Sequence, residues 1–171
     1  MSDVAARVGV TEPVIFQNFG TKAELFAAAL ERVASDAAAY LRGLADRSED
    51  VHDWLRHLLA ADHLDHLHTA PMFGVLLADA HRLHFEAGIG RALDHCVTRV
   101  AEAMADILRR GQTDGSIRTD ASPEYLAWLV VSLIHARQFR RSHTPESGAV
   151  LEADLLARTL DALRPSSLPS R

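Results

Sequence analysis

The fold is decided by one stretch near the start of the chain, which runs Val4-Ala5-Ala6-Arg7-Val8-Gly9-Val10-Thr11-Glu12-Pro13-Val14-Ile15-Phe16-Gln17-Asn18-Phe19-Gly20-Thr21-Lys22-Ala23-Glu24-Leu25-Phe26. Gly9 ends a short helix, and Pro13 opens a second one, because a proline in the first turn has no needed N–H to lose. Thr21 and Glu24 then form a capping box for a long third helix. Two short helices joined by a tight turn are typical of a helix-turn-helix, whose second helix can enter the major groove of DNA.

The side chains of this stretch separate onto different faces. We expect two apolar faces to meet across the turn at Gly9; they are formed by Val4, Ala5, Val8, Ile15, Phe16 and Phe19. The polar side chains of the second helix are then left pointing outward: Thr11, Glu12, Gln17 and Asn18. Because Gln and Asn amides can pair bidentately with adenine edges, this outward face has the chemistry of direct base readout.

The rest of the chain also reads as helices, since strand signals are nearly absent and Ala, Leu, Arg and Glu dominate. Further helices are expected from Ser48 or Asp50 to Leu59, from Thr69-Ala70-Pro71 to about Glu86, from Gly88 and Gly90 to about Gln112, from Ser122-Pro123-Glu124 onward, and from about Ala149 to Leu163. The sequence therefore predicts an all-α fold. It divides into a helix-turn-helix head with a connecting helix at residues 1–46, a helical-bundle body for ligand binding and dimerisation at 47–164, and a disordered tail at 165–171.

Composition limits the possible classes of protein. The chain has 171 residues, of which 48% are hydrophobic and 24% are charged, as in ordinary globular proteins. It has no apolar run of about 18 residues and no secretory signal pattern, so no membrane partner is expected. A single cysteine, Cys96, cannot form an internal disulfide, which favours a reducing, cytoplasmic setting. With a net charge of −5, any nucleic-acid contact must come from a local surface.

Residues 4–26 closely resemble the TetR family of bacterial transcriptional regulators. The shared signature is an Ala-rich helix, Gly-Val-Ser/Thr, a small residue or Pro, Leu/Ile-aromatic, His/Asn-Phe, a small pair, Lys and Glu-x-Leu. The resemblance implies a double-stranded DNA operator as partner, contacted by Thr11, Glu12, Val14, Phe16, Gln17, Asn18 and Lys22. Lys22 would meet a phosphate at the start of its helix, where the helix N-terminus also favours anions.

The head departs from the family at three points. Phe16 stands where the family commonly has a tyrosine that donates to a phosphate, so its ring is expected only to pack. Family members carry a further helix before the helix-turn-helix, and we expect this chain to be shortened or degenerate there. Residues 1–26 hold two basic and three acidic side chains, a net of −1, whereas phosphate neutralisation supplies most non-specific affinity for DNA. Weak DNA binding, or none, is therefore expected.

The helical body is expected to form a dimer. The helix in residues 122–143 is apolar nearly all round, so it must be covered on more than one side, by a second subunit or by a well-buried monomeric core. The resemblance implies the former, a two-fold four-helix interface. Its candidate residues are Leu126, Leu129, Val130, Leu133, Ile134, Arg137, Leu151, Leu155, Leu156, Leu160 and Leu163.

The resemblance also implies a cavity in the body for an inducer, a small and largely apolar molecule. Candidate lining residues are Trp54, Leu58, Met72, Phe73, Leu76, Leu77, Phe85, Cys96, Met104, Trp128 and Phe139. Each of them alone reads as ordinary core. Only their shared excess of large and flexible side chains favours an adaptable binding site.

Ten histidines raise the question of a metal. His63, His66 and His68 lie near Asp62 and Asp65, and His81 and His84 are one helical turn apart, as metal ligands can be. Neither a His-Glu-x-x-His motif nor a nucleophile-base constellation accompanies them, so neither a metal, a cofactor nor catalysis is expected. A ligand-released repressor is therefore the first hypothesis. A dimeric small-molecule-binding protein without operator binding is the second, and a His/Asp metal-dependent enzyme is the third.

Overall fold

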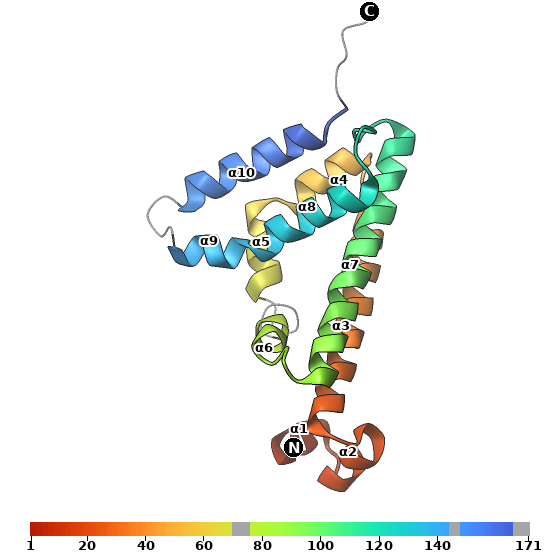
Figure 1. The fold of residues 1–171 in the computed structure, drawn as a ribbon, viewed down its shortest axis with the longest axis vertical. Coiled ribbons are helices and arrows are strands. Elements are labelled where there is room, and N and C mark those ends of the chain that lie inside the picture. Colours follow the sequence, from red (N-terminus) through yellow and green to blue (C-terminus); the bar gives the residue numbers. More distant parts are fainter. Residues whose placement is uncertain (70–75, 144–147, 166–171) are drawn as a thin grey trace, which may run out of the picture.

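A computed structural model describes residues 1–69, 76–143 and 148–165 of the chain, and every regular element in these ranges is an α-helix (Figure 1). The all-α prediction is confirmed. The helices are α1 (Ser2–Val8), α2 (Glu12–Phe19), α3 (Lys22–Ala45), α4 (Val51–Leu58), α5 (Ala61–Thr69), α6 (Leu76–Arg82), α7 (Ala87–Asp114), α8 (Pro123–His135), α9 (Arg137–His143) and α10 (Gly148–Leu163). Across the described residues, none of them combines the length and apolarity needed to cross a bilayer.

Two long helices, α3 and α7, lie side by side as a stalk that positions everything else (Figure 1). The predicted capping box starts α3: the Glu24 backbone N–H donates to Thr21 Oγ1 at 3.1 Å, and the Thr21 N–H donates to Glu24 Oε2 at 2.8 Å. Gly115, with φ at 82°, ends α7. The small helices α1 and α2 sit at one end of the stalk, and α4, α8 and α10 gather at the other (Figure 1).

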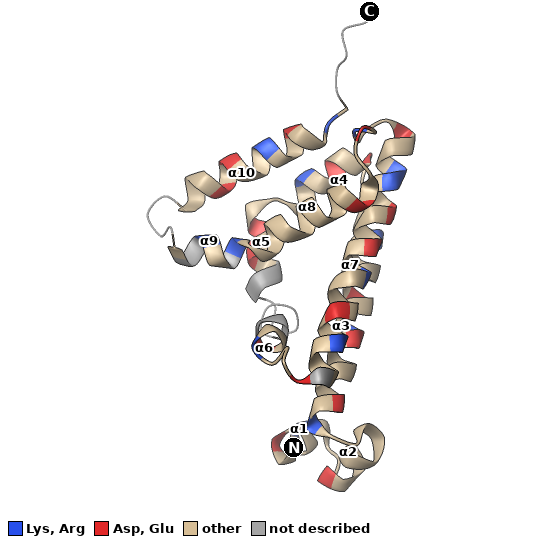
Figure 2. Cartoon of the chain, viewed as in Figure 1, with Lys and Arg blue, Asp and Glu red and all other residues tan. Residues whose placement is uncertain are grey.

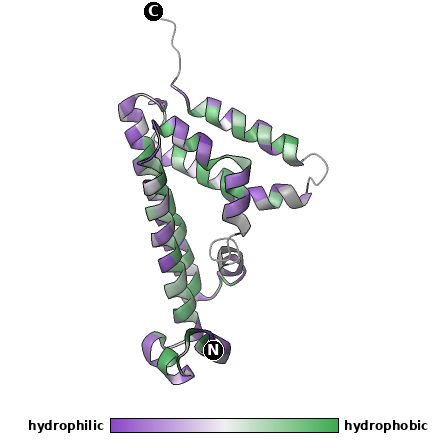
Figure 3. Cartoon of the chain, turned by 180° about the vertical axis from the view of Figure 1, so that it is seen from behind, coloured by the Kyte–Doolittle hydropathy of each residue, from purple (hydrophilic) through white to green (hydrophobic). Residues whose placement is uncertain are grey.

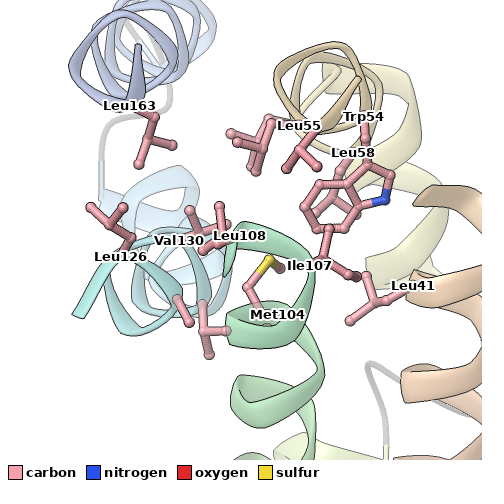
Figure 4. Close-up of a cluster of buried hydrophobic side chains, with 14 of the residues drawn as sticks. Leu41, Trp54, Leu55, Leu58, Met104, Ile107, Leu108, Leu126, Val130 and Leu163 are labelled. Carbon is pink, nitrogen blue, oxygen red and sulfur yellow. The ribbon is translucent and has the colours of Figure 1, made fainter. Parts of the chain in front are cut away.

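The main core fills the end of the body away from the head. Trp54 and Leu58 of α4, Met104 and Leu108 of α7 and Leu126 of α8 are fully or almost fully buried there (Figure 4). A second, smaller core lies nearer the head, where α3, α6 and the start of α7 meet. Because α3 contributes to both cores and also follows α2 directly, it is the element that joins the head to the body.

The body differs from the expected helices in three places. Helix α5 was not predicted, because its His- and Asp-rich sequence has few apolar side chains. The expected helix from residue 71 to Glu86 is represented by the shorter α6; its predicted start at Ala70-Pro71 lies outside the described residues. The expected helix over 122–143 is two helices, separated at Ala136. The Arg140 guanidinium donates to the carbonyl of Leu133 at 2.9 Å, which satisfies an acceptor that the break releases.

Candidate DNA-binding head and partner surface

The turn between α1 and α2 is held by Gly9. Its φ of 73° lies in the left-handed region that favours glycine, and the Val10 N–H donates to the Ala5 carbonyl at 3.1 Å. Ala5 and Ile15 are buried, whereas the remaining large apolar side chains of the two helices are exposed. The expected burial of Val4, Val8, Phe16 and Phe19 is therefore corrected: two short helices provide too little surface to cover them.

The predicted DNA-contacting residues share one end of the molecule. Thr11, Val14, Phe16, Gln17, Asn18 and Lys22 are exposed, and Glu12 is half-buried. Asn18 differs from Gln17 in one respect, because its Nδ2 donates to the Val14 carbonyl at 2.8 Å within α2 itself. Phe16 is 43% exposed, so it does not simply pack inside as its sequence suggested.

Charge on the head is sparse, as Figure 2 shows. Glu12 is the one charged residue of α2, and Lys22 lies just beyond it at the first position of α3. Few groups can therefore attract phosphates. The net charge of −1 over residues 1–26 limits the electrostatic part of the affinity for DNA.

The stripe expected at a dimer interface faces mostly inward. Leu126, Val130, Arg137, Leu156 and Leu163 are buried inside the protomer, so they have no surface left to offer a partner. Four others are half-buried: Leu133, Ile134, Leu155 and Leu160. Only Leu129 and Leu151 of the expected stripe are exposed.

Large apolar side chains on α8, α9 and α10 are nevertheless exposed, and we refer to them together as the outer face. It is made of Tyr125, Trp128, Leu129, Phe139, Val150 and Leu151. In the rear view, hydrophobic residues alternate with hydrophilic ones along α10 (Figure 3). Where such side chains form a contiguous patch, they mark a contact surface.

The residues expected to line one ligand cavity are spread over several places. Trp54, Leu58 and Met104 belong to the main core, Cys96 belongs to the smaller core, and Phe85 and Phe139 are exposed. Trp128 instead borders a groove of about 140 Å³ between α7 and α8. Met72 and Phe73, with the side chains of Leu76 and Leu77, lie outside what the structure describes.

Among the residues that the structure describes, three buried side-chain nitrogen atoms have no hydrogen-bond partner. One is Nε of Arg137, which lies 3.5 Å from Glu152 Oε2. The other two have no counter-charge beside them. They are Nε1 of Trp54 in the main core and Nε2 of His63 on α5. The His63 ring stacks on Tyr40 of α3 with ring centroids 5.9 Å apart. Burial, followed by the nearby His66, lowers the pKa of His63, so its ring is neutral at pH 7. Such atoms cost free energy unless something supplies a partner.

A buried ionic network that the sequence did not reveal ties α5, α9 and α10 together. Glu152 and Arg137 are only 5% and 4% exposed. Glu152 Oε1 accepts from Arg140 Nε at 2.5 Å, and its other oxygen lies 3.5 Å from Arg137 Nε. Arg137 Nη1 also donates to Asp65 Oδ1 at 2.8 Å. A signal was present, since Glu152 lies one turn before Leu156 on the inward face of its helix.

The histidines do not converge on a metal-binding arrangement in the described part of the chain. His81 of α6 and His135 of α8 approach with ring centroids 6.5 Å apart. Among the residues that the structure describes, no three His, Cys, Asp or Glu side chains are placed to hold a metal ion. The side chain of His68 lies outside that description.

Comparison with known proteins agrees with this geometry. Residues 1–29 match the family described as bacterial regulatory proteins, tetR family. The N-terminal segment is that of the TetR family. The crystal structure of reduced NemR from E. coli has a similar fold, with a TM-score of 0.66 over 95% of this chain and 83% of that one, at 17% identity. A search of curated proteins found no match. The matched head is of the kind found in DNA-binding transcription regulators, and the likeness to NemR shows the fold alone.

Cys96 is expected to react slowly in the folded protein. The side chain is 1% exposed, and burial raises the pKa of its thiol, which Arg99 only partly opposes. Because the thiolate is the reactive form, less of it is present near neutral pH than in a free cysteine. We predict labelling by a disulfide reagent more than about tenfold slower in buffer than in denaturant. Equal rates would show that the smaller core is open to solvent.

Proposed function

We propose that this protein is a ligand-responsive transcriptional repressor, which binds a palindromic operator as a homodimer and leaves it when a small, largely apolar molecule enters the body. The observation that carries the proposal is the head: the Gly9 turn buries Ile15 and so turns the other side of α2 outward. An exposed second helix held this way has the shape that docks in a major groove. Lys22, at the first position of α3, supports it with a cation for a phosphate.

Dimerisation through the outer face supports the same function. Trp128 is 47% exposed, and Tyr125, one turn before it on α8, is 64% exposed. Covering this face with a second copy removes apolar surface from water and places two heads in one particle. A two-fold dimer then addresses two half-sites about 34–36 Å apart, one turn of DNA.

Release by a ligand is proposed to act through α3. Leu30 and Ala34 lie in the smaller core and Leu41 in the main one, so α3 senses the packing of the whole body. A ligand that separates these helices would tilt α3 and move α2 out of register with the groove. The unpartnered Trp54 Nε1 is a donor, which favours a ligand that carries an acceptor oxygen on its apolar frame.

A dimeric small-molecule-binding protein without operator binding is the second candidate. The observation that favours it is the head itself, whose net charge is −1 over residues 1–26 and whose Val4, Val8 and Phe19 are exposed. Under this alternative the same body binds its ligand, but α2 holds no DNA.

A gel shift separates the two candidates. The test uses the complete chain with DNA flanking its own gene, at low and at physiological salt. The repressor proposal predicts a shifted band that weakens with salt, and Lys22→Ala is expected to reduce the salt slope by about one per head. Arg32→Ala, which removes an exposed cation from the side of α3, is the matched control and is expected to leave the slope unchanged. Absence of any shift at low salt, together with a dimer in sedimentation, favours the second candidate.

A further inference from the structure

The outward face of α2 is unusually apolar for a helix that meets DNA. Ile15 is buried, and on a helix of this pitch Pro13 and Gln17 lie on the side opposite to it, flanked by Val14 and Phe16. Val14 and Phe16 are exposed, at 39% and 43%. The face that α2 offers to a partner is therefore made of three apolar residues and one amide.

Hydrogen-bonding groups on this face are few. Glu12 is the one charged residue of α2 and is half-buried. Asn18 lies toward the buried side, and its Nδ2 is engaged by the Val14 carbonyl. Of the two amide side chains on α2, that of Gln17 is therefore the one available to a base. Hydrogen bonding from α2 to base edges depends on this residue.

The major groove offers one apolar feature that matches such a face. Each base pair there presents hydrogen-bond donors and acceptors, and thymine alone adds a C5-methyl group, which apolar side chains contact. An amide such as that of Gln17 pairs bidentately with adenine, the partner of thymine. Phe16 has no hydroxyl with which to donate to a phosphate, but its exposed ring can contact a thymine methyl group.

We propose that Val14 and Phe16 read thymine methyl groups and that Gln17 reads an adenine beside them, so that each half-site contains A·T pairs opposite α2. This inference rests on the proposed operator binding and specifies the chemistry of the sequence that is bound. Specificity comes from methyl contacts and one amide, while phosphate contacts contribute little because the head has few cations.

The test begins with selection of bound duplexes from a random pool by the complete chain. Each thymine of the recovered half-site is then replaced by deoxyuridine, which removes the methyl group and keeps the base pairing. At a contacted thymine we expect affinity to fall about fourfold, the worth of one buried methyl. Phe16→Ala and Val14→Ala are each expected to bind DNA more weakly. Each is also expected to bind the thymine and deoxyuridine duplexes equally well at the position that the replaced side chain contacts.

Val8→Ala is the control for Val14→Ala, because it removes the same atoms from an exposed valine of α1. This variant is expected to keep the preference for thymine over deoxyuridine.

The outcomes are distinguishable from failure of the proposed function. Binding of a selected sequence with no response to uracil at any position overturns the methyl inference and leaves operator binding intact. Selection of G·C-rich half-sites does the same. Absence of binding to every duplex, including non-specific binding at low salt, overturns both. Because Val14 and Phe16 are exposed, their replacement is expected to leave thermal unfolding unchanged. That result would show that a lost preference for thymine over deoxyuridine does not come from a lost fold.

Discussion

Replacing Glu152 with alanine is expected to lower the free energy of unfolding by about 3–5 kcal/mol, because it leaves two arginines without their buried counter-charge. Arg137 is itself buried, and Arg140 is held to Glu152 through two nitrogen–oxygen contacts. The loss would loosen α9 and α10, which carry half of the outer face. Denaturant unfolding followed by circular dichroism measures the effect.

Asp154 provides the control for this substitution. It lies on the same helix and pairs with Arg158 at 2.7 Å, but both side chains are exposed. Exposed ion pairs of this kind contribute about 0–1 kcal/mol, so Asp154→Ala is expected to change stability little. If the two variants unfold alike, the network around Glu152 is not an essential part of the body.

Trp128→Arg is expected to turn the dimer into a monomer and to weaken operator binding by at least about 100-fold, since the second head then no longer binds as part of the same particle. An arginine at this position brings like charges together across a two-fold axis. Because Trp128 is 47% exposed, the fold is expected to persist. Sedimentation reports the mass, with about twice 18.7 kDa expected for the unmodified protein.

Phe85→Arg makes the matching change away from the outer face. Phe85 is an exposed aromatic residue between α6 and α7. The control is expected to remain dimeric and to bind DNA as the unmodified chain does. A Trp128→Arg variant that stays dimeric would move the interface to another part of the surface.

Local sequence chemistry predicted the head and the helix ends well. The capping box at Thr21 and Glu24, the cap at Ser122 and the glycine stop at Gly9 each depend on a few neighbouring residues, and each is present. The break at Ala136 was not predictable in this way, because no proline or glycine marks it. Just after the break, Arg137 and Arg140 pair with Glu152 of α10, and this contact between separate helices has no local sequence signal.

The sides of α8 could not be told apart from sequence. Leu126 and Val130 face the core while Tyr125, Trp128 and Leu129 face solvent, although all five are large and apolar. The spacing of apolar residues identifies the inner face of a helix only when the other face is polar. The same ambiguity placed Phe85, Trp128 and Phe139 in an expected ligand cavity, whereas the structure exposes them.

The central claim is that a pair of these chains presents two copies of α2 to one DNA duplex. Sedimentation of the complete chain with a duplex carrying two selected half-sites one turn apart tests it most directly. We expect a complex of two chains per duplex. At low protein concentration, this complex is expected to be lost when either half-site is scrambled. It is also expected to be lost when Gln17 and Phe16 are both replaced by alanine. A complex of one chain per duplex, or one that the double variant forms equally well, would contradict it.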